Sequence, residues 1–386
     1  MNDGYHPALA WHGAAWQSLQ PLRARGVHAL LLHGAAGIGK KSLALDLARA
    51  TLCEAPATDG HACGACAGCL LTAAGSHPDL RVVVPDTMAA WRGATADDEL
   101  APEDGPTDDA DVEPAPEGSA KTKRLSREIR IEQVRALADF VATSTHRGGS
   151  RVVMLAPAES LNTASANALL KMLEEPPPAS LFVLVTDALD DVLPTIRSRC
   201  VLFRVPAPSH DAALAWLGQQ MAAQPDGASG TRAEDVLAAA GGSPLAALTE
   251  AAGTGLDPDL RTVLADLLTR GAQLSAADIA ASVPKTVPVG PSLALFQRWG
   301  WDLLALSTVR SATAVRYHPS AASALARVAG QADAGAVLAW LDRLTRYRQT
   351  QDHPLNPRLV IEAALLDYIA CFQRIDGRQA ARRPDR

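Results

Sequence analysis

The stretch from Ser160 to Cys200 places the strongest constraint on the fold. Asn162 is a suitable N-cap, and apolar residues recur at helical spacing behind it until three prolines, starting at Pro176, stop the helix. Leu181 to Val185 is then an unbroken apolar run, which is typical of a strand buried on both faces of a parallel sheet. The stretch therefore predicts a helix and a central strand of an α/β domain.

Four other apolar runs have the length and composition of strands: Val27–Leu32, Leu80–Val84, Arg151–Leu155 and Val201–Val205. Amphipathic helical patterns lie between several of them. We expect a parallel α/β domain that ends near Pro206. The rest of the chain reads as helices only, most clearly at Trp299–Val309, Ala334–Arg348 and Pro357–Phe372, the last with Asn356 as its N-cap.

Composition limits how this chain can build its cores. Hydrophobic residues make up 48% of the 386 residues and aromatic residues only 4%, so we expect cores of Ala, Leu and Val in two or three domains. Asp97 to Glu117 holds ten carboxylates and no base, and without them the net charge changes from −6 to +4. A mildly basic body is compatible with nucleic acid nearby. Residues 87–126 read as a disordered or loosely ordered acidic insertion.

The N-terminal residues show neither a basic region nor an apolar core of the kind found in signal peptides, and no apolar run could span a bilayer. We therefore expect a cytoplasmic protein without a membrane partner. Six cysteines in such a protein favour metal binding or isolated thiols over disulfides.

A glycine loop follows the first predicted strand and precedes a helix expected from about Lys41 to Cys53. Its residues with the phosphate-binding pattern are Gly34, Gly37, Gly39 and Lys40. Glycines let backbone N–H groups approach phosphates, and Lys40 would reach the outer phosphates. A P-loop needs a hydroxyl after this lysine to hold Mg²⁺, but the next residue is Lys41, and Ser42 comes one position late. The pattern favours a glycine turn kept for its backbone shape over productive Mg-ATP binding.

The end of the third strand agrees with this loss. A nucleotide hydrolase carries two acids there, one for Mg²⁺ and one to activate water. This chain has Ala156 and Pro157 instead. Glu159 is displaced from the strand end, so we interpret it as a surface or helix-cap charge.

Four of the six cysteines lie close together in the sequence with the spacing C-x9-C-x2-C-x2-C: Cys53, Cys63, Cys66 and Cys69. Each C-x2-C step lets two thiolates converge on one ion, and four thiolates complete a tetrahedron. With four protein ligands no position stays open for substrate. The spacing therefore predicts a structural rather than a catalytic zinc ion.

The order of the glycine loop, the cysteine motif, the segment Ser165–Pro177 and the triplet Ser198-Arg199-Cys200 resembles the bacterial clamp-loader subunits of DNA polymerase III. Asn356-Pro357-Arg358 at the start of an apolar helix is also similar. The resemblance implies a parallel-sheet AAA+ P-loop domain over 1–206 with an inserted zinc module at 53–69. It also implies a small helical lid at 207–255, an all-helical collar at 256–375 and a basic tail at 376–386.

The resemblance also implies the function. The collar would assemble into a hetero-pentamer with ATP-binding gamma/tau-like motor subunits and a delta subunit, and the complex would act on the sliding clamp and primer-template DNA. Lys41, the pair Ala156-Pro157 and the triplet Ser243-Pro244-Leu245 replace motor residues at the nucleotide site. These departures resemble the family's structural subunit, which contributes an arginine. Arg199 would act in trans on a neighbour's ATP, and Thr186 matches a sensor position.

Other interpretations stay open at this point. Arg199 could instead be a surface arginine that caps its own helix. The intact Gly39-Lys40 keeps weak ATP binding open, so the chain could be an ATP-binding motor subunit, an autonomous ATPase or a P-loop kinase. A zinc-module DNA-binding protein is a third interpretation, although Ala and Gly fill the gaps between the cysteines where base-reading residues would be needed.

Overall fold

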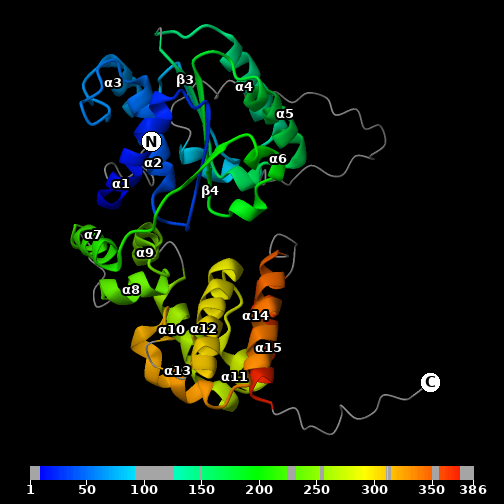
Figure 1. Cartoon of the computed structure of the whole chain (residues 1–386). Helices are drawn as coiled ribbons and strands as arrows, with labels where there is room; N and C mark the ends of the chain where they lie inside the picture. Colours follow the sequence, from blue (N-terminus) through cyan, green and yellow to red (C-terminus); the bar gives the residue numbers. More distant parts are fainter. Residues whose placement is uncertain are drawn as a thin grey trace, which may run out of the picture. The chain divides into compact units, whose positions relative to one another are not determined.

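The structure is a computed structural model (Figure 1), and it describes residues 9–91, 126–147, 149–223, 232–252, 256–309, 311, 314–349 and 356–373. The chain divides into two compact units, Met1–Pro208 and Ser209–Arg386. Most of the predicted acidic insertion, residues 92–125, lies outside the described residues, and so does the predicted basic tail at 376–386. Asp86–Trp91, by contrast, form a 3-10 helix, η2, so the first residues of the predicted insertion are helical.

The first unit is built on a five-stranded parallel sheet with the strand order β2-β3-β4-β1-β5. The strands are β1 (Ala29–His33), β2 (Leu80–Val83), β3 (Arg151–Leu155), β4 (Ser180–Thr186) and β5 (Val201–Arg204). All five predicted strands are confirmed, and their ends differ from the predicted ends by at most two residues. The parallel arrangement brings the carboxyl ends of β1, β3 and β4 to one edge of the sheet, where the loops after these strands meet.

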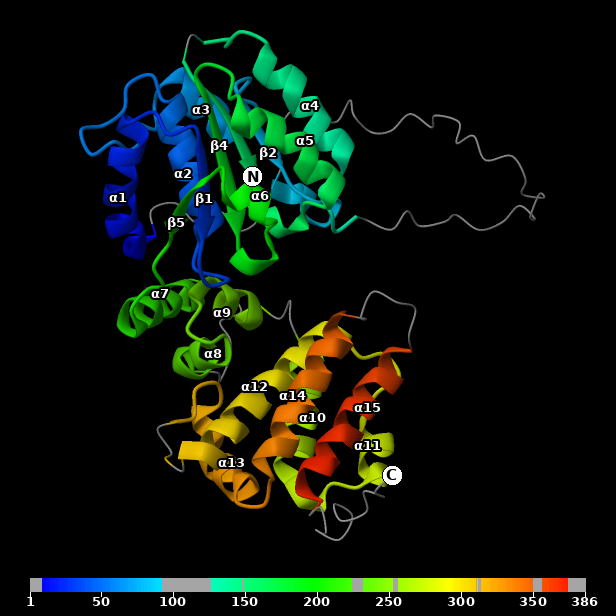
Figure 2. The same ribbon diagram turned by 45° about the vertical axis from the view of Figure 1, so that its right-hand side comes forward.

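Helices cover both faces of this sheet (Figure 2). On one face, Leu30 and Leu32 of β1 pack with α1 (Gly13–Ala24) and α2 (Lys40–Leu52). On the other face, Leu31 packs with α4 (Ile131–Ala142) and α5 (Thr163–Glu174). Alternate residues of one strand therefore serve two cores. Both cores consist mainly of Leu, Val and Ala, as the composition predicts.

Short elements complete the first unit: η1 (Ala10–His12), α3 (Ala67–Ala74), η4 (Ala158–Ser160), η5 (Leu189–Asp191) and α6 (Pro194–Arg197). The predicted N-cap of α5 is confirmed, because the Asn162 side chain accepts a hydrogen bond from the backbone N–H of Ser165 at 2.9 Å. The helix ends at Glu174, before the prolines, as expected.

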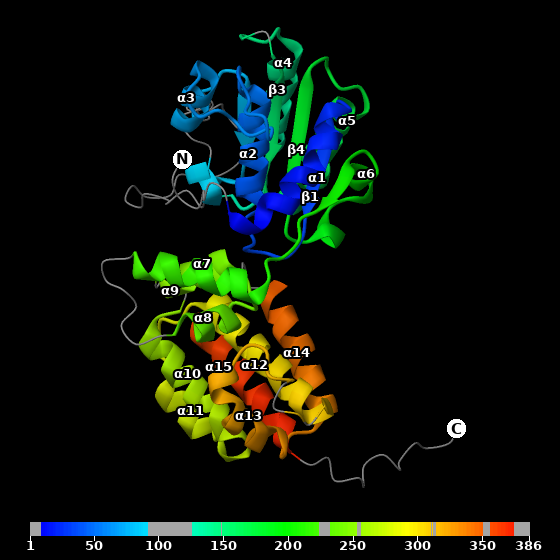
Figure 3. The same ribbon diagram turned by 60° about the vertical axis from the view of Figure 1, so that its left-hand side comes forward.

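The described part of the second unit contains helices and no strand (Figure 3). Three helices share a small apolar cluster: α7 (His210–Ala222), α8 (Ala233–Ala239) and α9 (Pro244–Ala251). A larger cluster joins α10 (Pro258–Arg270), α11 (Ala276–Ser282), α12 (Val289–Val309), η8 (Pro319–Ala321), α13 (Ala322–Ala329), α14 (Ala334–Gln349), α15 (Pro357–Ile369) and η9 (Ala370–Phe372). The 3-10 turn η6 (Gly271–Gln273) lies between α10 and α11. The predicted division into a lid and a collar near residue 255 stays a prediction, because both clusters belong to one compact unit.

The centre of the larger cluster is aromatic, which the composition did not predict. Trp299, Trp340 and Tyr368 are each at most 1% exposed. Trp299 donates to the Tyr368 hydroxyl at 3.1 Å, and that hydroxyl donates to the carbonyl of Leu268 at 2.7 Å. Trp340 donates to the carbonyl of Ala364 at 2.8 Å. Large rings can be buried here because each polar tip has a partner.

Across the described ranges, none of the helices combines the length and the apolar character that a bilayer span requires.

Candidate functional site

The glycine loop after β1 keeps a shape that only glycine adopts without strain. Gly37 and Gly39 have φ values of 72° and 90°, in the left-handed region, and Gly39 precedes the first residue of α2. A Cβ added at Gly39 would lie 2.3 Å from Cδ1 of Leu9, and one at Gly34 would lie 2.7 Å from the carbonyl oxygen of Val205. The loop is therefore held by its neighbours on two sides.

The N-terminal 3-10 helix η1 holds this loop from the outside. The indole of Trp11 donates to the carbonyl oxygen of Ile38 at 2.9 Å, and Nε2 of His12 lies 3.0 Å from the same oxygen. His12 is buried, and burial lowers the pKa of its imidazole. The chain thus begins its described part with a 3-10 turn followed directly by α1.

Lys40 does not extend toward an outside phosphate. Its ammonium is 2.9 Å from the carbonyl oxygen of Gly34, 2.5 Å from that of Ala35 and 2.5 Å from Oδ1 of Asp187. An ammonium has three N–H donors, and these three acceptors are enough to use all of them. The Lys40 side chain is only 2% exposed, whereas that of Asp187 is 47% exposed. The lysine of the glycine loop is therefore already paired with acceptors from its own loop and from the residue after β4.

Lys41 lies where a P-loop has its Mg²⁺-binding hydroxyl, and its side chain turns toward η2. Its ammonium is 5.3 Å from the ring centre of Trp91 and 3.7 Å from the sulfur of Met88. Burial lowers the pKa of Lys41, and the negative charges of Asp187 and Glu159 oppose this shift. A cation thus takes the place that a metal ligand would need.

The acids around this edge of the sheet differ from those of a hydrolase. Ala156, fully buried, follows β3, so no carboxylate stands at that strand end. Glu159 lies in the first turn of η4 and is half-buried, which agrees with its interpretation as a surface or helix-cap charge. Its Oε1 also accepts the backbone N–H of Asp187 at 3.1 Å, a contact that was not predicted, and its Oε2 is buried. Thr186 is buried, and its hydroxyl accepts the N–H of Ala188 at 3.0 Å, which caps the end of β4. The positive charges of the two lysines at this edge of the sheet are thus matched by the negative charges of Asp187 and Glu159.

The four predicted cysteines meet in space. Their sulfur atoms all lie within 4.8 Å of one another. The sulfurs of Cys53 and Cys66 are 3.8 Å apart, and those of Cys63 and Cys69 are 3.9 Å apart. Four sulfurs placed tetrahedrally at about 2.3 Å from one zinc ion would lie roughly 3.8 Å from each other. The donor set and its spacing therefore fit a structural zinc ion, which would be held entirely by this chain.

Hydrogen bonds and burial shift the pKa values of the thiols in this cluster. Hydrogen bonds from backbone N–H groups lower the pKa of the Cys63 thiol. Burial opposes ionisation of Cys66, but hydrogen bonds from backbone N–H groups and with the Cys63 and Cys69 side chains outweigh it and bring the pKa to about 6. Burial raises the pKa of Cys69 to about 12. Four thiolates cannot share this space without a cation, and a zinc ion would supply the missing positive charge.

Arg199 follows α6 and is about one third exposed. Its Nε donates to Oε1 of Glu174 at 2.5 Å, and its Nη2 forms an ion pair with the same oxygen. Its Nη1 donates to the carbonyl of Thr195 at 3.1 Å and to the hydroxyl of Ser198 at 3.2 Å. The bond to Thr195 is the helix-capping contact of the simpler interpretation. The pair with Glu174 was not predicted, although both residues belong to the motifs that the sequence singled out.

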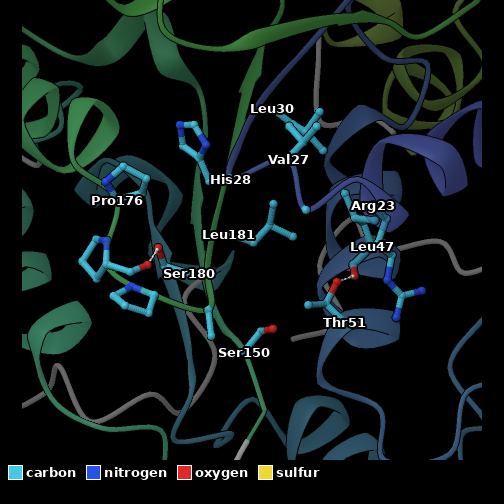
Figure 4. A pocket seen from close by; sticks show the side chains of 14 residues that line it. Arg23, Val27, His28, Leu30, Leu47, Thr51, Ser150, Pro176, Ser180 and Leu181 are labelled. Carbon is cyan, nitrogen blue, oxygen red and sulfur yellow. Dashed lines mark hydrogen bonds between the residues drawn. The ribbon is translucent and has the colours of Figure 1, made fainter.

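A cavity of about 530 Å³ lies at the opposite end of the strands from the glycine loop (Figure 4). Val27 and His28, which precede β1, line it together with Ser180 at the start of β4. Arg23 also lines it, but its guanidinium donates to the carbonyls of Gly60 and Ala50 at 3.1 and 2.5 Å. The cavity therefore shares no residue with the phosphate loop.

The chain is similar to proteins of known family. The family described as DNA polymerase III, delta subunit, matches residues 15–209, which include the whole sheet, the four cysteines and Arg199. The DNA polymerase III subunit delta' of Pseudomonas aeruginosa is 38% identical over 237 residues, which are 61% of this chain and 59% of that protein. The subunit delta' of Escherichia coli is 34% identical over 229 residues, 58% of this chain and 54% of that protein. The chain thus matches little more than half the length of these relatives.

Among solved structures, a crystal structure of a DNA polymerase III gamma subunit-related protein from Thermotoga maritima aligns with a TM-score of 0.39 and 15% identity. The alignment covers 93% of this chain and 100% of that chain.

Proposed function

This chain belongs to the DNA polymerase III delta subunit family, and we propose that it acts as the delta-prime subunit of a clamp loader, which places the sliding clamp on primed DNA during replication. Two similar relatives carry the name subunit delta'. In this proposal the first unit is an AAA+ module and the second supplies the lid and the collar. The partners are gamma/tau-like motor subunits and a delta subunit in a hetero-pentamer, which contacts the clamp and primer-template DNA in the cytoplasm.

The observation that carries the structural role is the closed phosphate loop. Lys40 is paired with Asp187 and with two carbonyls of its own loop. Lys41 stands in the place of the metal-binding hydroxyl, and Ala156 follows β3 where a hydrolase has an acid. Hydrolysis of ATP needs a bound Mg²⁺ and a positioned water. We therefore expect little or no ATPase activity from this chain by itself.

Arg199 is the group that this subunit would contribute to catalysis. It would reach the ATP of the neighbouring motor subunit as an arginine finger. A guanidinium is planar and permanently charged, and its N–H groups match phosphate oxygens. Its partial exposure at the end of α6 supports this role, because an acceptor from outside the chain can approach it. In other phosphoryl-transfer systems such an arginine contributes about 10³–10⁵ in rate.

The test is a reconstituted loader in which only the motor subunit next to this chain keeps a functional phosphate loop. Arg199→Ala should lower ATP hydrolysis at that site by about 10³-fold. Arg197→Ala is the control, because Arg197 is the last residue of α6, two positions before Arg199, and pairs with the exposed Asp190. Equal hydrolysis by the wild type and Arg199→Ala would refute the arginine finger.

One observation favours a second function, that of an ATP-binding motor subunit or an autonomous P-loop ATPase. The loop keeps the backbone shape of a phosphate site, with glycines in the left-handed region and Lys40 at the helix start. Titration of the purified chain with ATP separates the two functions. Tight binding that requires Mg²⁺ would favour the motor, whereas weak binding that ignores Mg²⁺ would favour the structural subunit.

A further inference from the structure

We propose that Glu174 is a positioning residue for Arg199, holding the guanidinium in the orientation in which it meets the neighbour's phosphate. The proposal rests on the arginine-finger function of Arg199. Glu174 is the last residue of α5, and Arg199 lies 25 residues later, after α6. One carboxylate oxygen of Glu174 accepts from Nε and pairs with Nη2, so it binds one edge of the guanidinium.

A second element holds the opposite side of the group. Nη1 donates to the carbonyl of Thr195 in α6 and to the hydroxyl of Ser198. An arginine has five N–H groups, and these contacts use four of them. Among the described residues no acceptor is recorded for the second N–H of Nη2, which therefore remains for a phosphate oxygen from outside the chain. The long, flexible side chain is thus fixed between two helices before any partner arrives.

Local stability does not explain an acid at this position. The carboxyl end of a helix carries a partial negative charge, so Glu174 at the end of α5 is unfavourable for the helix itself. The pair with Arg199 is exposed to water, with side-chain exposures of 34% for Arg199 and 46% for Glu174. Exposed pairs of this kind contribute little to folding because water screens them. What the pair does achieve is to restrict where the guanidinium points.

The same exposure allows the arginine to change partners. A triphosphate carries more negative charge than one carboxylate, and water weakens the attraction between Glu174 and Arg199. Glu174 therefore orients the guanidinium without withholding it from ATP. The backbone under Glu174 is rigid, since Leu173 and Met172 beside it are buried in the core and Pro176 prevents the helix from continuing.

The chain offers a matched control in the adjacent residue. Glu175 is also exposed and also stands at the end of α5, but its side chain has no recorded polar contact with the described residues. Replacement of either glutamate by alanine removes one negative charge from the same helix end. Only Glu174→Ala removes the contact to Arg199.

The experiment uses the reconstituted loader in which only the adjoining motor subunit keeps a functional phosphate loop, and it measures kcat and KM for ATP. Glu174→Ala should lower kcat roughly tenfold with little change in KM, since a misplaced catalytic group affects the transition state more than ground-state binding. Glu175→Ala should behave as the wild type. Glu174→Ala combined with Arg199→Ala should be no slower than Arg199→Ala alone. The urea midpoint of Glu174→Ala should match that of the wild type.

The contrary outcomes distinguish a failure of the positioning role of Glu174 from a failure of the arginine finger itself. A kcat of Glu174→Ala equal to that of Glu175→Ala overturns the proposal, and so does a higher kcat, which would mean that Glu174 restrains the arginine. A double variant slower than Arg199→Ala would show that Glu174 acts through some other group. If Arg199→Ala itself leaves hydrolysis unchanged, the arginine finger fails and the role of Glu174 fails with it. If Arg199→Ala is slow and Glu174→Ala is normal, only the positioning role is lost.

Discussion

The pair of Lys40 and Asp187 predicts an asymmetry between the two residues. Lys40→Met removes a buried charge and replaces it with an apolar chain of similar length, while Asp187 stays half in water. The cost of removing one partner of a buried pair comes mainly from the buried charge left behind, and here the remaining carboxylate is half exposed and hydrated, so we expect a change in the free energy of unfolding within about 1 kcal/mol. Asp187→Ala instead leaves a buried ammonium without its counter-ion.

The cost of Asp187→Ala can be estimated from the contacts. Breaking a fully buried pair costs about 3–5 kcal/mol. Asp187 is 47% exposed, and Lys40 keeps the carbonyls of Gly34 and Ala35, so the expected loss is smaller, about 2 kcal/mol. Removal of the acid should therefore destabilise the first unit more than removal of the base.

Hydrogen exchange of the sheet amides, monitored as urea is added, measures the free energy of unfolding of the first unit separately from that of the second. Two units need not unfold together, so a single midpoint would not suffice. Lys40→Met should also support hydrolysis by the reconstituted loader at the wild-type rate, because in the proposed function Lys40 binds no phosphate. A greater loss of stability in Lys40→Met than in Asp187→Ala would refute the reasoning, and so would a loader inactivated by Lys40→Met.

Two further predictions concern the cysteine cluster and the N-terminal turn. Metal analysis of freshly purified protein should find about one zinc ion per chain. The variant Cys66→Ser should lose most of this zinc and should unfold at a lower temperature in calorimetry. A wild-type protein without zinc would contradict the prediction. Burial lowers the pKa of His12, so between its folded pKa and about 6.5 the unfolded chain binds more protons, and stability should fall as pH falls through this range. His12→Asn should make that decline shallower in urea titrations at pH 7.5 and 5.5, and an unchanged slope would exclude His12 as a source.

Local signals were predicted well from the sequence, since their causes lie within a few residues. The bounds of β3 were predicted as Arg151–Leu155, the run that the structure shows. Asn162 caps α5 through the N–H of Ser165, three residues away. The cysteine cluster was predicted for the same reason, because two of its four ligands follow others at C-x2-C spacing and the turns between them are short.

Contacts between distant segments were not predicted. Glu159 was interpreted as a surface or helix-cap charge, and its contact with the N–H of Asp187 was not predicted. The contact arises because β3 and β4 are neighbours and end at one edge of the sheet. The low aromatic fraction of the sequence also did not predict the aromatic centre of the larger cluster in the second unit, because a few aromatic residues can lie together in one place. Percentages record how many rings a chain has and carry no information on where they meet.

The sequence by itself determined the α/β order of the first unit, the glycine loop, the cluster of four cysteines, and the presence of Lys41 and Ala156 where a P-loop hydrolase has a hydroxyl and an acid. These features depend on residue type and short spacing. Only the tertiary structure decided what the remaining charges do. Parallel strands bring Lys40 to Asp187, and the return of the chain after α6 brings Arg199 to Glu174. Which charges pair depends on strand order and loop paths, because Coulomb attraction acts between atoms that the fold has already placed together.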